Sequence, residues 1–452
     1  MNIGLIAMSG VRAYDPELTR LGVTLPGFVE RNRIIASLPS LGLLTLAALT
    51  PAKHGVRYLE IEDIRKETTF PEDFDLVAIS SYSAQIKEAY ELGDWYLQRK
   101  IPVVLGGTHV TALPEEAKRH CSSVVIGEGE PLWPHLLEDF ERGALQPFYV
   151  AVPPGDYDLA EAPIPRYDLL DPDKYNRLTV QTSRGCPHRC DFCASSILLT
   201  PKYKLKPIPK VMQEIQAIRA VWDRPFIEFA DDNSFCRPAH YRNLLRQMEK
   251  EKLRWFTEAD ISVAKDDELL ARMRDSGCKQ VLVGLESPCR ESLNGIELKG
   301  NWKMRQWERY LDAIRKIQSY GITVNGCFIL GLDGDTVEVF DQVWEFVQES
   351  ALYEVQITVM TAFPGTPLYE RLKRENRIIK NGAWELCTLF DVNYVPKGMS
   401  PDELRAGLVR LAERIYSEEV TRKRRSRFKR MLKTSPNFGQ SSKGGSNVAQ
   451  EH

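Results

Sequence analysis

Arg184-Gly185-Cys186-Pro187-His188-Arg189-Cys190-Asp191-Phe192-Cys193 places three cysteines within eight residues of the chain. The spacing C-x3-C-x2-C supplies one thiolate fewer than the four that usually hold an iron–sulfur cluster. Three thiolates can bind three corners of a [4Fe–4S] cubane and leave the fourth iron open to a small molecule. A zinc knuckle is the alternative, but zinc sites usually have four ligands in paired C-x2-C units, and no second pair and no H-x3-5-H pattern is found. The loop therefore predicts a [4Fe–4S] cluster on Cys186, Cys190 and Cys193.

The bulk composition sets the class of protein. The chain has 452 residues and a formal net charge of −2, which predicts two or three domains and no general attraction to nucleic acid. Nine cysteines, an odd number, predict reduced thiols rather than a disulfide framework. No run approaches the roughly eighteen apolar residues of a transmembrane helix, and residues 1–7 fit a buried strand better than an export signal. We expect a cytoplasmic protein without a transmembrane segment.

Residues 1–145 alternate short apolar runs with helical stretches. Continuous apolar strands separated by helices predict a parallel sheet covered on both faces, which is a doubly wound, Rossmann-like α/β domain. The expected strands are residues 3–7, 56–61, 76–80, 103–105 and 124–126, and the expected helices are residues 41–49, 84–98 and 114–119.

Small and polar residues follow three of these strands, in the stretches Ser80–Ser83, Gly106–His109 and Gly127–Glu130. Ligands of doubly wound domains bind beyond the carboxyl ends of the strands. Glycines there let the backbone approach a ligand, and hydroxyl groups can donate to it. On this reasoning alone, ordinary strand-to-helix turns are an equal alternative.

Residues 176–400 repeat the strand–helix pattern. Six parallel strands with crossover helices predict a partial (βα)6 barrel of the TIM type, with its chemistry at the carboxyl ends of the strands, where the cysteine loop begins. Residues 146–175 are rich in proline and are expected to form an extended linker. The expected strands are residues 178–181, 226–229, 255–259, 280–285, 323–329 and 355–359.

The two halves together resemble the radical S-adenosylmethionine (SAM) proteins that carry an N-terminal cobalamin-binding domain. The cysteine motif, with the aromatic Phe192 before its third cysteine, is similar to the radical SAM signature. Residues 103–109, 113–117 and 125–130 look like the cobalamin-binding domain, as do residues 40–49. The resemblance covers nearly all of residues 1–400, and it implies a [4Fe–4S] cluster, SAM and cobalamin as cofactors.

The resemblance implies cobalamin contacts at the strand ends of the first domain. The D-x-H-x-x-G motif that supplies a cobalt-binding histidine in other cobalamin domains is absent, as in most radical SAM relatives. We therefore expect no histidine on cobalt, with His109 as the minor alternative. The long segment of residues 9–39 is expected to cover the corrin or line a substrate path. The expected cobalamin contacts are Ser80, Ser81, Gly106, Gly107, His109, Gly127, Glu128 and Gly129.

SAM contacts are expected at the strand ends of the barrel. Glu228, Asp231 and Asp232 could hold the SAM ammonium group, although a solvated acidic turn is the alternative. Glu286 interrupts an apolar run and needs a partner. The family pattern places further polar contacts there and packs residues near Ile329 on the adenine. No catalytic residue is assigned. The expected SAM contacts are Phe192, Glu228, Asp231, Asp232, Ser262, Glu286, Ser287 and Ile329.

The C-terminal part, residues 401–452, is expected to form a helix followed by a basic, disordered tail. Ser400–Glu403 has the pattern of a capping box and predicts a helix to about residue 417. The basic run 422–430 is interpreted as a solvated face rather than a site for RNA or an anionic membrane. Residues 435–452 are rich in Ser, Gly and Asn, which predicts disorder. The six other cysteines are too scattered for a second cluster.

The resemblance implies an enzyme that cleaves SAM reductively to a 5′-deoxyadenosyl radical and transfers a methyl group from methylcobalamin to an unactivated carbon. One alternative is a radical cyclisation or rearrangement without methyl transfer, as in the anaerobic ring-forming cyclase of bacteriochlorophyll synthesis. Another is a non-enzymatic zinc- or cobalamin-sensing protein. The expected partners are a small-molecule, lipid or natural-product substrate and an external electron donor of the flavodoxin or ferredoxin type.

Overall fold

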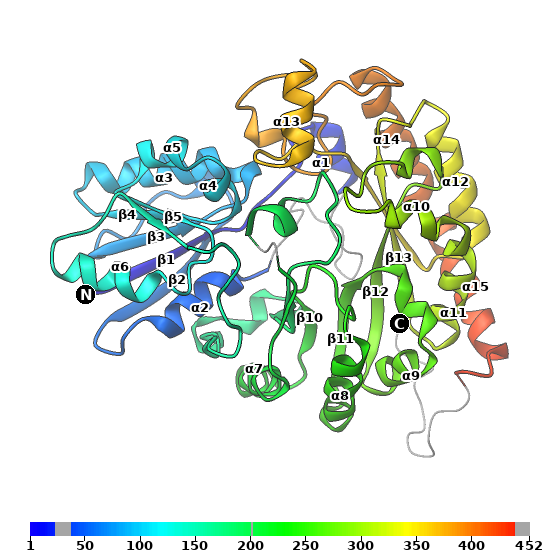
Figure 1. Ribbon diagram of the computed structural model, residues 1–452, viewed down its shortest axis with the longest axis horizontal. Helices are drawn as coiled ribbons and strands as arrows, with labels where there is room; N and C mark the ends of the chain where they lie inside the picture. Colours follow the sequence, from blue (N-terminus) through cyan, green and yellow to red (C-terminus); the bar gives the residue numbers. More distant parts are fainter. Residues whose placement is uncertain (23–37, 200–201, 439–452) are drawn as a thin grey trace.

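Two six-stranded sheets lie side by side in the computed structural model, which describes residues 1–22, 38–199 and 202–438 (Figure 1). The first sheet has the strand order β2-β1-β3-β4-β5-β6, and the second has the order β14-β13-β12-β11-β10-β7. Every pair of neighbouring strands in both sheets is parallel. The predicted α/β class, with one doubly wound domain and one partial barrel, is confirmed.

Helices cover both faces of the first sheet. Helix α2 (Leu41–Leu49) and helix α6 (Trp133–Glu141) pack on one face, and α3 (Ile86–Gln98) packs on the other. The short helices α4 (Thr108–Ala112) and α5 (Pro114–Ala117) follow the fourth strand. The strands are β1 (Asn2–Met8), β2 (Gly55–Ile61), β3 (Leu76–Ser80), β4 (Val103–Gly106), β5 (Ser123–Ile126) and β6 (Phe148–Val150).

The expected linker contributes to the fold more than its prolines suggested. Strand β6 lies within it and forms the edge of the first sheet beside β5. This strand has only three residues, too few for a recognisable alternation. Further along, Leu159, Ala162 and Tyr167 are buried. Only part of residues 146–175 is therefore an extended connection.

The second sheet is an open barrel, because its edge strands β7 and β14 do not pair. The strands are β7 (Leu178–Val180), β10 (Phe226–Phe229), β11 (Arg254–Ala259), β12 (Cys278–Glu286), β13 (Thr323–Leu330) and β14 (Glu354–Val359). The helices that follow them include α7 (Ile208–Val221), α8 (Pro238–Met248), α9 (Asp267–Asp275), α10 (Trp302–Gln306), α11 (Tyr310–Ser319) and α12 (Val339–Ser350).

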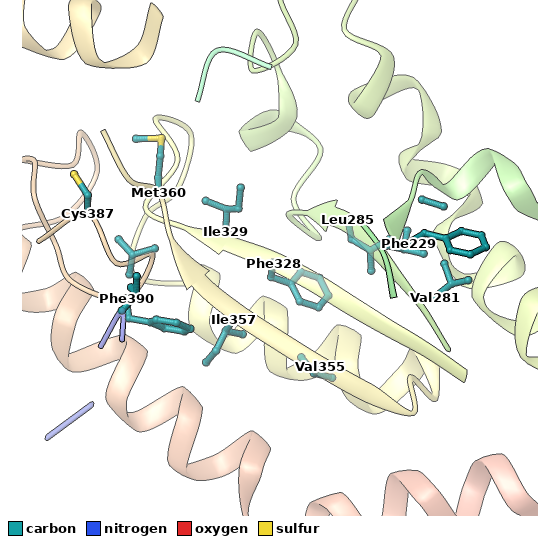
Figure 2. Close-up of a cluster of buried hydrophobic side chains, with 14 of the residues drawn as sticks. Phe229, Val281, Leu285, Phe328, Ile329, Val355, Ile357, Met360, Cys387 and Phe390 are labelled. Atoms are coloured by element: carbon teal, nitrogen blue, oxygen red, sulfur yellow. The ribbon is translucent and has the colours of Figure 1, made fainter. Parts of the chain in front are cut away.

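Alternate residues of the barrel strands face the helices or the barrel interior. Figure 2 shows Phe328 and Ile357 in the apolar layer, and the ring of Phe328 lies 5.7 Å from that of Phe346 on α12. Ile329 is on the opposite side of the same strand. The interior-facing positions include polar residues such as Glu228 and Glu258 as well as apolar ones such as Ile329.

The C-terminal helices pack beside the barrel (Figure 1). Helix α13 (Pro367–Arg374) precedes α14 (Pro401–Tyr416), which begins with the predicted capping box of Ser400 and Glu403. The basic run belongs to a further helix, α15 (Glu418–Thr434), which was not predicted from the sequence. None of the described helices is both long and apolar enough to cross a membrane.

The interpretation of the basic run as a solvated face is wrong for one residue. Arg424 of α15 is 2% exposed and pairs with Glu354 at the start of β14. At the end of this helix the hydroxyl of Ser435 donates to the carbonyl oxygen of Ser319 at 2.7 Å. The rest of the tail expected to be disordered, residues 439–452, is outside the described residues.

The segment after the first strand reaches the barrel. Helix α1 (Pro16–Leu21) follows Asp15, whose carboxylate pairs with Arg405 of α14. The backbone N–H of Tyr14 donates to Asp391 at 2.8 Å. Residues 23–37 are outside the described residues, and with them about half of the segment, residues 9–39, that is expected to cover the corrin.

Candidate functional site

A cavity of about 360 Å³ lies at the carboxyl ends of the first sheet. Helix α2 and the ends of β3, β4 and β5 form its first wall. The opposite wall comes from the second half of the chain and includes residues beside the cysteine loop. The residues that line it include Leu41, Leu46, Ser80, Gly106, Gly107, Gly127, Glu128, Gly129, Glu130, Trp133, Gln181, Arg184, Ser195, Lys206 and Asp232.

Six of the eight expected cobalamin contacts line this cavity, namely Ser80, Gly106, Gly107, Gly127, Glu128 and Gly129. Gly107 and Gly127 have φ angles of +109° and +88°, which favour glycine. A Cβ atom on Gly127 would also stand 3.2 Å from Ala151. The strand ends therefore present bare backbone to the cavity, as a bulky ligand requires.

Ser81 and His109 do not line the cavity. The hydroxyl of Ser81 donates to the neighbouring carbonyl oxygen of Tyr82 at 2.9 Å. His109 on α4 is completely buried, with its Nδ1 atom 3.0 Å from the hydroxyl of Ser83 and its Nε2 atom 3.5 Å from Glu116. Its ring is held within the domain, which favours the expectation of no histidine on cobalt.

Glu128 connects the two halves. One carboxylate oxygen lies 2.9 Å from Arg184 and 2.9 Å from Lys204, and the other accepts from the backbone N–H of Tyr157 at 3.0 Å. Glu130 accepts from the same guanidinium at 2.5 Å. Burial alone would raise the pKa of Glu128, but hydrogen bonds from Lys204, Tyr157 and Arg184 lower it below its ordinary value. Glu128 is therefore a charged anchor at the cavity wall.

The cysteine loop begins after β7 with the short strand β8 (Ser183–Arg184), which pairs with β9 (Lys204–Leu205). Cys190 is buried, whereas Cys186 and Cys193 are half-buried. No disulfide joins any of the nine cysteines, all of which lie in described parts of the chain. Burial raises the pKa of the Cys186 thiol to about 11, so metal binding would have to displace its proton.

Cys186, Cys190 and Cys193 supply three candidate metal ligands from one loop. In the described part of the chain, no group of three or more His, Cys, Asp or Glu side chains forms a site for one metal ion. Thiolates of a cubane each bind a different iron, so they need not converge on one point. Burial raises the pKa of the Cys190 thiol. Lys303 opposes this effect, whereas Glu286 and the two other thiols of the loop, Cys193 and Cys186, add to it. One loop thus presents three neighbouring thiols, as a three-cysteine cubane needs.

Two of the three acids predicted at the end of β10 hold the loop in place. Asp231 accepts from the backbone N–H groups of Thr182 and Ser183, each at 2.8 Å, and is 5% exposed. Asp232 accepts from the backbone N–H of Gly185 at 2.7 Å and also lines the cavity. Asp231 is therefore already hydrogen-bonded within the protein, and its assignment to the SAM ammonium group stays a prediction.

Glu228 and Glu258 face the barrel interior from neighbouring strands. Glu228 pairs with Arg177. The Glu258 carboxylate has no hydrogen-bond partner among the described residues, and burial followed by the charges of Glu228 and Asp232 raises its pKa to about 8. Glu258 is thus the interior carboxylate best placed to receive a cationic ligand.

Glu286 ends β12 with a φ angle of +65°, which is unusual for a residue with a side chain. Its carboxylate lies 2.7 Å from Lys303, which also donates to the carbonyl oxygen of Gly284 at 2.7 Å. The sequence predicted that Glu286 needs a partner, and the structure shows that this partner is Lys303. The sequence alone could not identify it. Burial lowers the pKa of Lys303, but Glu286 outweighs it and the pKa lies above its ordinary value.

The remaining expected SAM contacts surround this region. Ser262 donates its backbone N–H to Asp260 at 2.8 Å, and Asp260 lies 3.2 Å from His188 in the cysteine loop. Ser287 is buried and its hydroxyl accepts from the backbone N–H of Cys289. Phe192 and Ile329 belong to or pack against the core.

Comparisons with known proteins match three family models. The Radical SAM superfamily matches residues 180–347, the B12 binding domain matches residues 34–137, and a domain of unknown function (DUF4070) matches residues 366–451. The first two descriptions agree with the two halves of the chain described above.

Curated relatives extend over both halves. A bacteriochlorophyllide d C-12(1)-methyltransferase of Chlorobaculum tepidum is 28% identical over 392 residues, which is 85% of this chain and 84% of the relative. A hopanoid C-2 methylase of Rhodopseudomonas palustris is 30% identical over 359 residues, or 76% of this chain and 66% of the relative.

The solved structure of TsrM from Kitasatospora setae, a radical S-adenosylmethionine methyltransferase with cobalamin and a [4Fe–4S] cluster bound, has the same fold. It matches with a TM-score of 0.66 and 16% identity, covering 92% of this chain and 89% of that one. With the cysteine loop, the glycine-lined cavity and both family models in agreement, the chain belongs to the family of radical SAM proteins with an N-terminal cobalamin-binding domain.

Proposed function

We propose that this chain is a cobalamin-dependent radical SAM methyltransferase that acts on an unactivated carbon of a small-molecule, lipid or natural-product substrate. The observation that carries the proposal is the shared cavity. Its walls join glycines from the ends of β4 and β5 to Arg184 and Asp232, which hold the cysteine loop. A methyl-group carrier bound along the glycine-lined wall would face the radical chemistry that starts at the cysteine loop.

The groups implied by the family fit the residues present. The thiols of Cys186, Cys190 and Cys193 would hold the [4Fe–4S] cluster, and the glycine-lined cavity would receive the nucleotide tail of cobalamin. When bound, the cluster supplies the electron that cleaves SAM to a radical, and cobalamin supplies a carrier for a methyl group.

The protein's own residues would bind and orient these groups. Glu258 would hold the SAM ammonium group, because its carboxylate has no protein donor among the described residues and a cation would favour its charged form. Glu286 is already paired with Lys303, so the pair would position the adjoining strand end rather than bind the ammonium. The ion pairs of Arg184 would fix the distance between the cysteine loop and the cobalamin wall.

Reconstitution under anaerobic conditions tests the proposal. Purified chain is supplied with iron, sulfide, cobalamin, reductant and labelled SAM, together with extracts of candidate substrates. Methyl transfer adds one methylene to the product mass, whereas cyclisation or rearrangement removes hydrogens or leaves the mass unchanged. A colourless zinc-containing protein that never forms 5′-deoxyadenosine would instead support the sensor alternative.

We also place the protein in the cytoplasm. The support is chemical: nine cysteines without a disulfide, three of them in a loop suited to an oxygen-sensitive cluster, fit a reducing compartment.

A further inference from the structure

An exposed basic surface lies directly behind the cysteine loop. Residues 189–191 run antiparallel to residues 296–298, with backbone N–H groups of Asp191 and Leu298 donating to Ile296 and Arg189, each at 2.9 Å. In this two-stranded ribbon, Cys190 is paired with Glu297. One strand of the ribbon therefore carries an expected cluster ligand, and the other leads from buried residues into the exposed Leu298 and Lys299.

The ribbon is rigidly held. The carboxylate of Glu297 is buried and accepts from the backbone N–H groups of Arg189, Lys299, Gly300 and Trp302, at 2.8 to 3.3 Å. These hydrogen bonds lower the pKa of Glu297 although its burial, the largest single effect, raises it. Neither acid of the ribbon is exposed: Glu297 is turned inward and bound by the backbone, and Asp191, which is 7% exposed, pairs with Arg371.

The side chains left outside are basic and apolar. Arg189, Lys299 and Arg305 are exposed, and none has a carboxylate within 4.0 Å among the residues that the structure describes. The Lys299 ammonium group reaches the carbonyl oxygen of Pro187 at 3.4 Å, and the guanidinium of Arg305 lies beside Gly300, so these two cations flank the end of the ribbon. Leu298, which is hydrogen-bonded to the backbone of Arg189 across the ribbon and precedes Lys299, is 52% exposed.

We infer that this surface, formed by Arg189, Leu298, Lys299 and Arg305, is the docking site for an acidic one-electron carrier protein of the flavodoxin or ferredoxin class. The inference rests on the proposed function, which requires an electron from outside the chain. Unpaired cations around an exposed leucine match an acidic partner with an apolar centre. A carrier docked here would stand next to Cys190, so the electron would cross little more than the ribbon itself.

The test separates docking from chemistry. The fully reconstituted enzyme is reduced either by flavodoxin hydroquinone or by reduced methyl viologen, and cluster reduction is followed by absorbance and electron paramagnetic resonance. The variant is Lys299→Glu/Arg305→Glu, with Lys299→Gln/Arg305→Gln as a milder form. Lys250→Glu is the matched control, because Lys250 precedes β11 and so lies at the opposite end of the barrel strands. Iron content is measured for every variant.

With flavodoxin at low salt, charge reversal should slow cluster reduction about tenfold or more, and the neutral variant should fall between it and the parent. High salt should remove the difference. Methyl viologen, a small cation, should reduce all variants as fast as the parent or faster. Equal flavodoxin rates in parent and charge-reversal variant, or an equal loss in Lys250→Glu, would overturn the inference. Absence of SAM cleavage in the parent with methyl viologen would count against the proposed function instead.

Discussion

The guanidinium of Arg184 and the carboxylate of Glu128 lie 2.9 Å apart, and this ion pair joins the cysteine loop to the glycine-lined strand end of the first domain. The two side chains are 14% and 3% exposed, and Glu130 and Lys204 extend the pair into a network. Loss of one partner would leave a buried charge without compensation, which is costly. The network therefore fixes how the two halves face each other.

Arg184→Ala should separate SAM cleavage from methyl transfer. The three cysteines remain, so 5′-deoxyadenosine should still form, whereas a misplaced cobalamin wall should lower methylated product about 100-fold. Both products are measured by mass spectrometry, and the visible spectrum of bound cobalamin is recorded. Arg219→Ala, which breaks an exposed pair with Glu251, is the control. Loss of both products in equal proportion would show that Arg184 does not position the halves.

Cys186→Ala, Cys190→Ala and Cys193→Ala should each abolish SAM cleavage and leave the fold largely intact, because the thiols lie on a loop outside the two sheets. Iron content, 5′-deoxyadenosine formation and thermal unfolding are the measurements. Cys278→Ala is the comparison, since Cys278 is a buried thiol at the start of β12 and should affect stability alone. A Cys190→Ala protein that cleaves SAM at the parent rate would refute the cluster assignment.

The cob(II)alamin form should show a base-off electron paramagnetic resonance spectrum without nitrogen splitting from a protein imidazole. His109 is the only histidine at a strand end of the first domain, and its ring nitrogens already contact Ser83 and Glu116. His109→Ala should lower the free energy of unfolding by about 1–3 kcal/mol and leave the spectrum unchanged. Nitrogen splitting that vanishes in this variant would make His109 a cobalt ligand.

Much of this arrangement could be predicted from the sequence, because it depends on local patterns. Buried parallel strands read as continuous apolar runs, so eleven expected strands appear in the structure within a few residues. The capping box of Ser400 and Glu403 is local in the same way. Strand β6 was not predicted, because its three residues are too few to show a recognisable pattern of apolar residues.

Contacts between distant residues were not predictable in the same way. Asp231 and Glu258 both end strands and look alike in the sequence. Only the fold shows that the backbone N–H groups of Thr182 and Ser183 donate to the Asp231 carboxylate. The Glu258 carboxylate, in contrast, has no hydrogen-bond partner among the described residues. Arg184 likewise reads as part of the cysteine motif, and its partner Glu128 is 56 positions away.

Glu258 should make the stability of the ligand-free protein depend on pH. Its pKa of about 8 in the fold exceeds the ordinary value of 4.5, so the folded state binds more protons than the unfolded state between these values. Stability from this group is therefore lost as pH rises from about 4.5 to 8. Glu258→Gln should be more stable than the parent at pH 8, by on the order of a few kcal/mol, and similar to it at pH 5.

The measurement is thermal unfolding of parent and Glu258→Gln across this pH range, with and without SAM. If Glu258 holds the SAM ammonium group, SAM should stabilise the parent at pH 8 and stabilise the variant less. A variant that follows the parent at every pH would show that the Glu258 carboxyl titrates normally. Equal stabilisation of both proteins by SAM would remove Glu258 from the binding site.

Turnover should consume two SAM molecules in different roles. One SAM is cleaved to the radical that removes hydrogen from the substrate. The other SAM replaces the methyl group that the carrier has transferred to the substrate. A carbon radical cannot readily take a methyl cation equivalent from SAM, so the methyl group would have to leave its carrier as a radical. One further electron from the external donor and a second SAM would then be needed to restore the methyl carrier. Because the cavity is walled by both halves, both events should occur in one chain. 5′-Deoxyadenosine and S-adenosylhomocysteine should therefore form in about equal amounts, each tracking product, once substrate-free SAM cleavage is subtracted. Deoxyadenosine and product without S-adenosylhomocysteine would exclude methyl transfer and favour the cyclase-like reaction.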